Sequence, residues 1–242
     1  MPYRRLPNTD AARMRALQVA RKQYELKGAE NVPYSSKIVH EISAFIPFFE
    51  RAIAEYKTSV ETQFAKNQKY QNQVRMVRMY ISHFIQVLNL SCQRNEIKPE
   101  KKLLYKLLPD NYSVPDLSTE MLLIEWGKNI IDGESERTRS GGAPIYNPAI
   151  SKVSVHYDQF CDSFQTKKVS KKNTDRYLES VQKLRIQADA LILNLWDQIE
   201  KAYAELGTEE MQNRAKEFGI VYYLRRKERQ ALGLPVSGDE DK

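Results

Sequence analysis

The sequence predicts an all-α protein, a four-helix bundle of two helical hairpins with short peripheral helices. From Thr174 to Leu206, apolar residues recur at steps of three and four, which is the period of a helix that buries one stripe. Only 9 glycines occur in 242 residues, and 29% of the residues are charged, a composition that suits long amphipathic helices. An apolar content of 41% is enough to supply a core.

Five segments follow from this pattern along the chain. They are an N-terminal segment with a short helix (1–34), a first hairpin (35–95), a connection with a short helix (96–147), a second hairpin (148–207), and a C-terminal helix with a strand-like segment and a disordered tail (208–242). The first helix is expected to begin at Asn8, Thr9 or Asp10, which can cap it, and to stop at Gly28.

The turn of the first hairpin is predicted at residues 58–63. Apolar density falls there, and Thr58-Ser59-Val60-Glu61 has the form of a capping box. Pro47 should kink the preceding helix, because it lacks a backbone donor. One uninterrupted helix of about 60 residues is the alternative, although helices of that length are rare in globular domains. The turn of the second hairpin is predicted around residues 167–172.

An offset of 111 residues aligns the two predicted hairpins. It places Pro33 on Pro144 and Phe49 on Phe160, and it matches apolar positions along both helices. An internal duplication would explain this match. The alternative is coincidence, since any two amphipathic hairpins can be brought into apolar register.

The connection and the C-terminus carry shorter elements. A basic helix is expected at residues 101–108, a helix capped by Asp116 or Ser118 should stop at Gly133, and a flexible loop should follow at 134–148. Thr208 should cap a last short helix that ends at Gly219, and the tail from Pro235 is expected to be disordered.

Five segments across the chain are distinctive: MPYRRLPNTDAAR, VPDLSTE, EWGKNIIDGE, SGGAPIYNP and FGIVYY. Together they resemble a family of uncharacterised helical proteins from Bacteroides-like bacteria, over most of the chain. The resemblance implies an intracellular helical protein and carries over no activity and no site residue.

No catalytic, cofactor or metal-binding residue is predicted. None of the three histidines follows a glutamate by three positions, as a di-metal helical bundle would require. The run from Ser140 to Pro144 lacks the Gly-Lys-Ser/Thr of a phosphate loop. An enzyme would need a site between hairpin and connection, for example one that uses Asp132, Glu134 and Glu136. We therefore expect a non-enzymatic binding or structural module without cofactors.

Basic clusters suggest the alternative of weak, sequence-independent binding to nucleic acid. The net charge is +7, and the candidate contacts are Lys167, Lys168, Lys171, Lys172, Arg225 and Arg226. Solvated helix ends are the plainer explanation for such clusters, because aromatic residues do not alternate with the basic ones.

A protein contact is the other candidate site. A short apolar run has the composition of a strand in a chain that otherwise offers almost none: Ile220, Val221, Tyr222, Tyr223 and Leu224. It must pair within the chain, for instance with residues 143–147, or with another copy or partner protein. With two cysteines, no secretory signal and no apolar stretch that could span a bilayer, the sequence predicts a cytoplasmic protein that does not enter the membrane.

Overall fold

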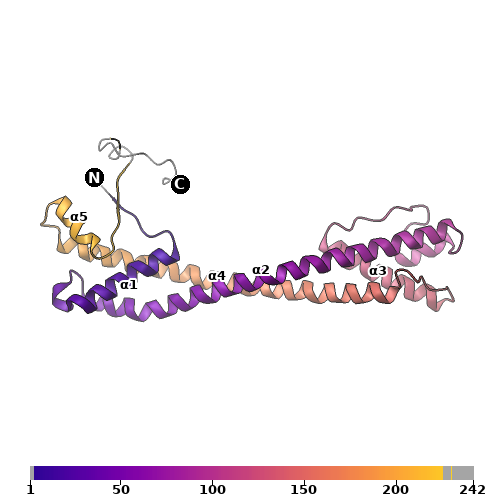
Figure 1. Ribbon diagram of the computed structural model, residues 1–242, viewed down its shortest axis with the longest axis horizontal. Coiled ribbons are helices and arrows are strands. Elements are labelled where there is room, and N and C mark those ends of the chain that lie inside the picture. The colour runs from indigo at the N-terminus through magenta and orange to yellow at the C-terminus, as the bar shows by residue number, and fades with distance from the viewer. Residues whose placement is uncertain (1–2, 226–229, 231–242) are drawn as a thin grey trace. The chain divides into compact units, whose positions relative to one another are not determined.

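The computed structural model describes residues 3–225 and residue 230. The all-α class is confirmed, because the described chain consists almost entirely of helices (Figure 1). In chain order its elements are β1 (Tyr3–Arg4), α1 (Asp10–Lys27), the 3₁₀ turn η1 (Ala29–Asn31), α2 (Ser36–Gln93), the 3₁₀ helix η2 (Pro99–Tyr105), α3 (Glu120–Arg139), α4 (Ile150–Ala202), α5 (Thr208–Lys216) and β2 (Tyr222–Tyr223).

Both predicted hairpin turns are wrong. Helix α2 runs without interruption for 58 residues and α4 for 53, so each predicted hairpin is one long helix. The reason is local, because neither long helix contains a glycine. The one proline in these helices, Pro47, is accommodated inside α2. The capping-box pattern at Thr58 is not enough to stop a helix when the residues after it are good helix formers. The chain therefore does not form a bundle of two hairpins.

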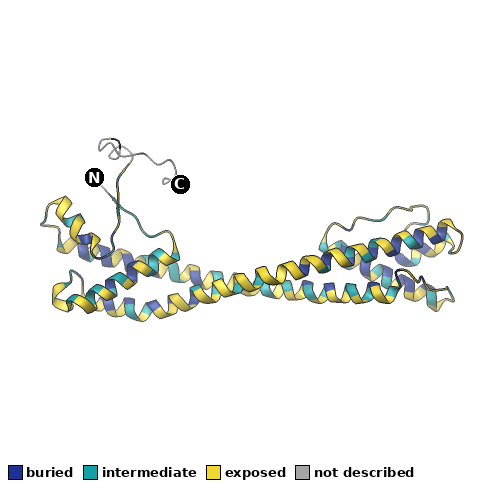
Figure 2. Cartoon of the chain, in the orientation of Figure 1, coloured by how far each residue is buried: buried dark blue, intermediate teal, exposed yellow. Residues whose placement is uncertain are grey.

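The chain divides into two compact units, and both long helices contribute to each. Unit 1 comprises Met1–Thr58 and Asp175–Lys242, and unit 2 comprises Ser59–Thr174. Each unit has its own hydrophobic core. In Figure 2 the buried positions gather in these cores. None of the helices in the described part combines the length and apolar character needed to cross a bilayer.

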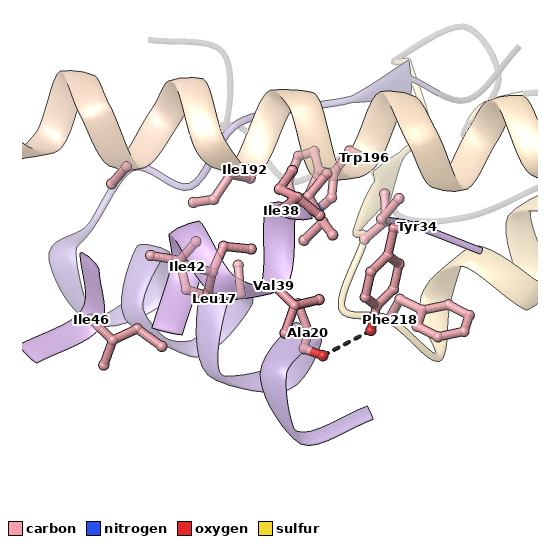
Figure 3. Close-up of a cluster of buried hydrophobic side chains, with 14 of the residues drawn as sticks. Leu17, Ala20, Tyr34, Ile38, Val39, Ile42, Ile46, Ile192, Trp196 and Phe218 are labelled. Carbon is pink, nitrogen blue, oxygen red and sulfur yellow. Dashed lines mark hydrogen bonds between the residues drawn. The ribbon is translucent and has the colours of Figure 1, made fainter. Parts of the chain in front are cut away.

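The core of unit 1 lies between α1 and the parts of α2 and α4 that belong to this unit (Figure 3). Leu17 and Ile42 are fully buried, and Trp196 from α4 is 2% exposed. The Tyr34 hydroxyl donates a hydrogen bond of 2.8 Å to the carbonyl oxygen of Ala20. The rings of Tyr34 and Phe218 pack edge to face, with their centroids 5.6 Å apart. Phe218 thereby ties the chain after α5 to this core.

Two ion pairs fix α1 against α4. Nε and Nη2 of Arg13 donate to the two carboxylate oxygens of Asp189 at 2.7 and 3.0 Å. Arg185 binds both oxygens of Asp10 at 2.7 Å in the same two-point manner. Helix α1 begins as predicted, with the Thr9 hydroxyl accepting from the Ala12 amide, and ends before Gly28 at φ 80°. Because each pair is formed by two parallel hydrogen bonds, it fixes the orientation of α1 on α4 as well as their contact.

The strand prediction is confirmed for Tyr222 and Tyr223, but the suggested partner at residues 143–147 is wrong. Strand β2 pairs antiparallel with β1, with Tyr223 opposite Tyr3 and Tyr222 opposite Arg4. The Tyr222 hydroxyl also donates to Glu200 at 2.8 Å. The two ends of the described chain therefore pair with each other in unit 1.

Unit 2 packs α3 and η2 against the other parts of α2 and α4, which run antiparallel here. Ser59 of α2 meets Thr174 of α4 with hydroxyl oxygens 2.6 Å apart, and Tyr80 stacks on His156. Both predicted ends of α3 are wrong, because Thr119 caps it in place of Asp116 or Ser118, and the helix continues past Gly133 to Arg139. This glycine is needed for close packing, because a Cβ there would lie 2.6 Å from the Tyr105 ring. The predicted flexible loop at 134–148 is thus helical in its first part.

Equivalent positions at the 111-residue offset share burial in the two long helices. Phe49 and Phe160 are both fully buried. The same holds for further pairs in which both members are 0% exposed: Ile42 and Val153, Val77 and Ala188, Ile81 and Ile192, Phe84 and Leu195, Leu88 and Ile199.

We expect alkaline pH to destabilise the protein in part through Tyr34. Burial, with a smaller effect of Tyr203, raises the pKa of Tyr34 from 10.0 to about 12. The folded state thus holds this proton more tightly than the unfolded state. The stabilisation is complete below pH 10 and is lost as the pH rises towards 12. Denaturant unfolding at about pH 8 and about pH 11 should show a smaller loss of stability for Tyr34→Phe than for the unchanged protein.

The control for this measurement is Tyr146→Phe, since Tyr146 is 80% exposed. It should show the same pH dependence as the unchanged protein. An equally steep loss in Tyr34→Phe would contradict the assignment to Tyr34.

Candidate functional site

A cavity of about 580 Å³ opens between α2 and α4 within unit 2. We call it the seam groove. Its walls come from residues 60–73 of α2 and 162–170 of α4. Its volume falls within the range of ordinary ligand and peptide pockets. Phe64 lies in its wall with 80% of its surface exposed, and Val60 is 41% exposed. Apolar surface therefore faces solvent here.

Polar side chains line most of the groove, at positions where tightly packed long helices carry apolar ones. On α4 the lining positions include Ser163, Thr166 and Ser170, spaced by three and four residues along one face. On α2 the lining residues include Gln63 and Asn67. Long helices that pack tightly carry Leu, Ile or Val at such seam positions. Short hydroxyl side chains there leave space, so the seam is underpacked at this level.

Lysines surround the seam groove. The two helix segments at residues 60–73 and 162–173 carry six lysines against two acidic residues, Glu61 and Asp162. Two of the lysines, Lys66 and Lys69, line the α2 side and are exposed. The groove therefore combines an apolar wall with a basic rim.

Of the four predicted lysine contacts on α4, Lys167 lines this groove, and all four lie inside a continuous helix and not at a turn. Lys167 lines the groove, and its Nζ bonds Glu120 of α3 at 2.7 Å and lies 4.3 Å from the Tyr70 ring centroid. The Nζ of Lys168 lies 4.5 Å from the Phe164 ring centroid. Lys171 and Lys172 are exposed. Helical spacing places all four on one broad side of α4.

Of the two predicted arginine contacts the structure describes Arg225, which belongs to a different unit from the lysines. Arg225 belongs to unit 1, where its guanidinium lies 5.8 Å from the centroid of the Tyr3 ring. Arg226 lies outside the described residues, as does the predicted disordered tail from Pro235.

The predicted protein contact at the C-terminal apolar run divides between core and surface. Ile220 is 1% exposed and belongs to the core of unit 1, while Val221 is 52% exposed. Tyr222 and Tyr223 are paired with β1, and Leu224 follows the strand. Pairing with β1 thus satisfies the backbone hydrogen-bonding groups of β2, which were the reason for expecting an external partner.

Sequence reasoning missed a buried polar cluster in unit 2. Glu134 is 0% exposed, and its carboxylate accepts from Arg137 at 2.8 and 3.0 Å and from the amide of Ile145 at 3.0 Å. The Tyr105 hydroxyl donates to the same carboxylate and accepts from Arg137 Nε at 2.8 Å. Burial and the Glu134 carboxylate raise the pKa of Tyr105, and Arg137 opposes them. Both Glu134 oxygens are thus occupied, which argues against a free acid–base catalyst.

A buried lysine closes the loop after η2. Lys102 is 0% exposed, and its Nζ donates to the carbonyl of Asn111 at 2.6 Å and lies 4.1 Å from the Tyr112 ring centroid. Burial lowers the pKa of Lys102. The Lys102 contacts hold the segment between η2 and α3, which is a structural role.

Metal chemistry finds no support in the part of the chain that the structure describes. No group of three or more His, Cys, Asp or Glu side chains is placed there to hold a metal ion. Both cysteines are free, and burial raises the thiol pKa of Cys92 and of Cys161, which disfavours the reactive thiolate.

No family model, curated protein or solved structure matches this chain. The resemblance to uncharacterised helical proteins therefore stays a prediction, and the function must be argued from the site alone.

Proposed function

We propose that this protein is a non-enzymatic binding module that takes an acidic amphipathic helix of a partner protein into the seam groove. The observation that carries the proposal is the underpacked seam, where exposed Phe64 faces a row of small hydroxyl side chains. A third helix could place apolar side chains into this space and complete the packing, as in helix-in-groove recognition.

Charge favours an acidic partner. Three lysines, Lys66, Lys69 and Lys167, line the groove against one acidic residue, and they attract a helix whose flanks carry Asp and Glu and repel a second copy of the same basic surface. Aromatic content disfavours nucleic acid, because single-stranded binding uses several exposed aromatic platforms. Of the two aromatic residues that line the groove, Tyr70 is 4% exposed and only Phe64 is open.

Fluorescence anisotropy with labelled synthetic peptides tests the proposal on the full chain. One peptide carries Leu at helical spacing with Glu between, a second has the same composition in shuffled order, and a third carries Lys in place of Glu. We expect tight binding of the first alone, and about tenfold weaker binding to Phe64→Ala, as for a central interface residue. Ile186→Ala is the matched control, because Ile186 of α4 is 72% exposed and belongs to unit 1.

A filling variant gives a second test. Ser170→Leu places an apolar side chain in the seam, so we expect it to raise the free energy of unfolding by about 1 kcal/mol and to abolish peptide binding. Equal binding of the shuffled peptide, or unchanged binding by both variants, would reject the proposal. Single-stranded RNA or DNA that binds at physiological salt, and is lost when Lys168, Lys171 and Lys172 become Ala, would establish nucleic-acid binding in its place.

We further propose that the chain arose by internal duplication of a short helix followed by a long one. The order α1–α2 recurs as α3–α4, and buried positions recur at the offset of 111 residues. Sequences of homologues test this. If the similarity between the two halves, averaged over homologues, is no higher at this offset than at others, duplication is rejected.

The cytoplasm is the proposed location. Two free cysteines are in keeping with a reducing compartment. Fractionation of the source cell, with an antibody to the protein, would contradict this if the protein appeared outside the cytoplasm.

A further inference from the structure

A second cavity of about 590 Å³ lies in unit 2, where the chain leaves α2 and α3. Its lining includes Lys98, Lys101 and Arg137, with Glu96 as the acidic residue. Glu96 lies 3.2 Å from Nε of Arg94, so its charge is partly compensated. The backbone carbonyls of Ser91 and Arg137, at the ends of α2 and α3, already accept hydrogen bonds from backbone amides. The amides of Glu96 and Ile97 donate to Ser91, and that of Gly142 donates to Arg137. Glu134 compensates the charge of Arg137, so Lys98 and Lys101 give the cavity its net positive charge.

Arg137 is built into the wall of this cavity. Its side chain is 4% exposed, and Nε and Nη2 are held by Glu134, Tyr105 and the carbonyl of Ala143. Nη1 donates to no other atom among the described residues, and it is not one of the fully buried atoms that lack a partner. The cluster thus holds the guanidinium rigidly and leaves one of its nitrogens available.

Gly142 leaves the room that this nitrogen needs. A Cβ at Gly142 would lie 2.6 Å from Arg137 Nη1 and 2.9 Å from the Arg137 carbonyl oxygen. The wall also carries apolar and aromatic residues, among them Val87, Ile97 and Tyr146, which is 80% exposed, beside two serines, Ser91 and Ser140. The cavity thus offers cationic groups to an anion and apolar surface to a flat ring.

We propose that this cavity binds a small organic phosphate. The phosphate group would accept from Arg137 Nη1 and from the ammonium groups of Lys98 and Lys101, and a ring would lie on Tyr146. Such bonds between charged groups are stronger than neutral ones. The proposal is independent of the seam groove, since the two cavities share no lining residue.

Isothermal titration of the full chain tests the proposal with phenyl phosphate, phenol and inorganic phosphate as probes. We expect phenyl phosphate to bind, inorganic phosphate to bind more weakly, and phenol not to bind. The double variant Lys98→Gln and Lys101→Gln should raise the Kd about tenfold or more, as expected for lost charged hydrogen bonds. The matched control is Lys128→Gln with Lys152→Gln, two exposed lysines of unit 2 that do not line the cavity.

Gly142→Ala should abolish binding by crowding Nη1. The melting temperature of Gly142→Ala is measured as well, to show whether the variant is folded. If Gly142→Ala is destabilised, the Kd of the lysine double variant tests the proposal instead. Equal binding of phenol and phenyl phosphate, or an unchanged Kd in the lysine double variant, would overturn the proposal. If inorganic phosphate binds as tightly as phenyl phosphate, the proposal that the ligand carries an organic ring is wrong.

Discussion

Phe49→Ala is expected to lower the free energy of unfolding by about 3–5 kcal/mol. Phe49 of α2 is fully buried in unit 1 and stacks on Phe45 with ring centroids 5.5 Å apart. Removing the ring loses its burial and leaves a cavity that the surrounding long helices cannot close. Urea unfolding followed by circular dichroism measures the change.

The neighbouring residue supplies the control for this experiment. Phe48 is 62% exposed, so Phe48→Ala removes the same atoms from a site that is mostly in water. We expect a change within about 0.5 kcal/mol for Phe48→Ala. Similar losses for the two variants would show that α2 does not bury the face that the structure assigns to it.

Glu134→Ala is expected to cost about 3–5 kcal/mol, because it leaves the Arg137 charge buried without its partner. The carboxylate is the shared acceptor for Arg137, Tyr105 and the Ile145 amide, so its loss also leaves a buried phenol and a backbone donor unpaired. Urea unfolding of the full chain, followed by circular dichroism, measures the loss.

Two further variants show whether the cause is the buried charge. Glu136→Ala on the same helix removes an exposed carboxylate that lies 3.4 Å from Arg139, and it should cost less than about 0.5 kcal/mol. The double variant Glu134→Leu with Arg137→Met should recover part of the stability, since no buried charge is then left alone. A double variant less stable than Glu134→Ala would contradict this explanation.

The sequence was sufficient to predict helices, the cap of α1 and much of the buried face, whereas the predicted caps of α3 and α5 are wrong. The stripe on α4 and the cap at Thr9 depend on local spacing and on one side chain, and both are visible in a single sequence. Where helices end was harder to predict. The fall in apolar density near Thr58 indicated a turn, yet this polar stretch is where the seam groove lies. Low apolar content marks an underpacked seam as readily as a turn.

The candidate sites could be predicted only in part. The lysines of α4 were visible as a cluster, but Phe64, which lines the groove together with Lys167, lies far away in the sequence, and only the packing of α2 on α4 places both in one groove. Glu134 and Arg137 stand three residues apart on α3, and the sequence gives the same pattern as an exposed helix pair. Their burial depends on Tyr105, a residue on η2, and on the chain after α3.

The division of the chain between the units also sets an order for folding during synthesis. Unit 2 is one continuous stretch, whereas unit 1 needs both the first 58 residues and those from Asp175 onward. A ribosome that releases the chain from its N-terminus supplies all of unit 2 before unit 1 can be completed. The apolar faces of α1 and early α2, including Leu17 and Ile42, must wait without their α4 partners until the residues after Asp175 have been made. A chain interrupted after unit 2 would expose these faces, and the newborn protein is then most in need of a chaperone.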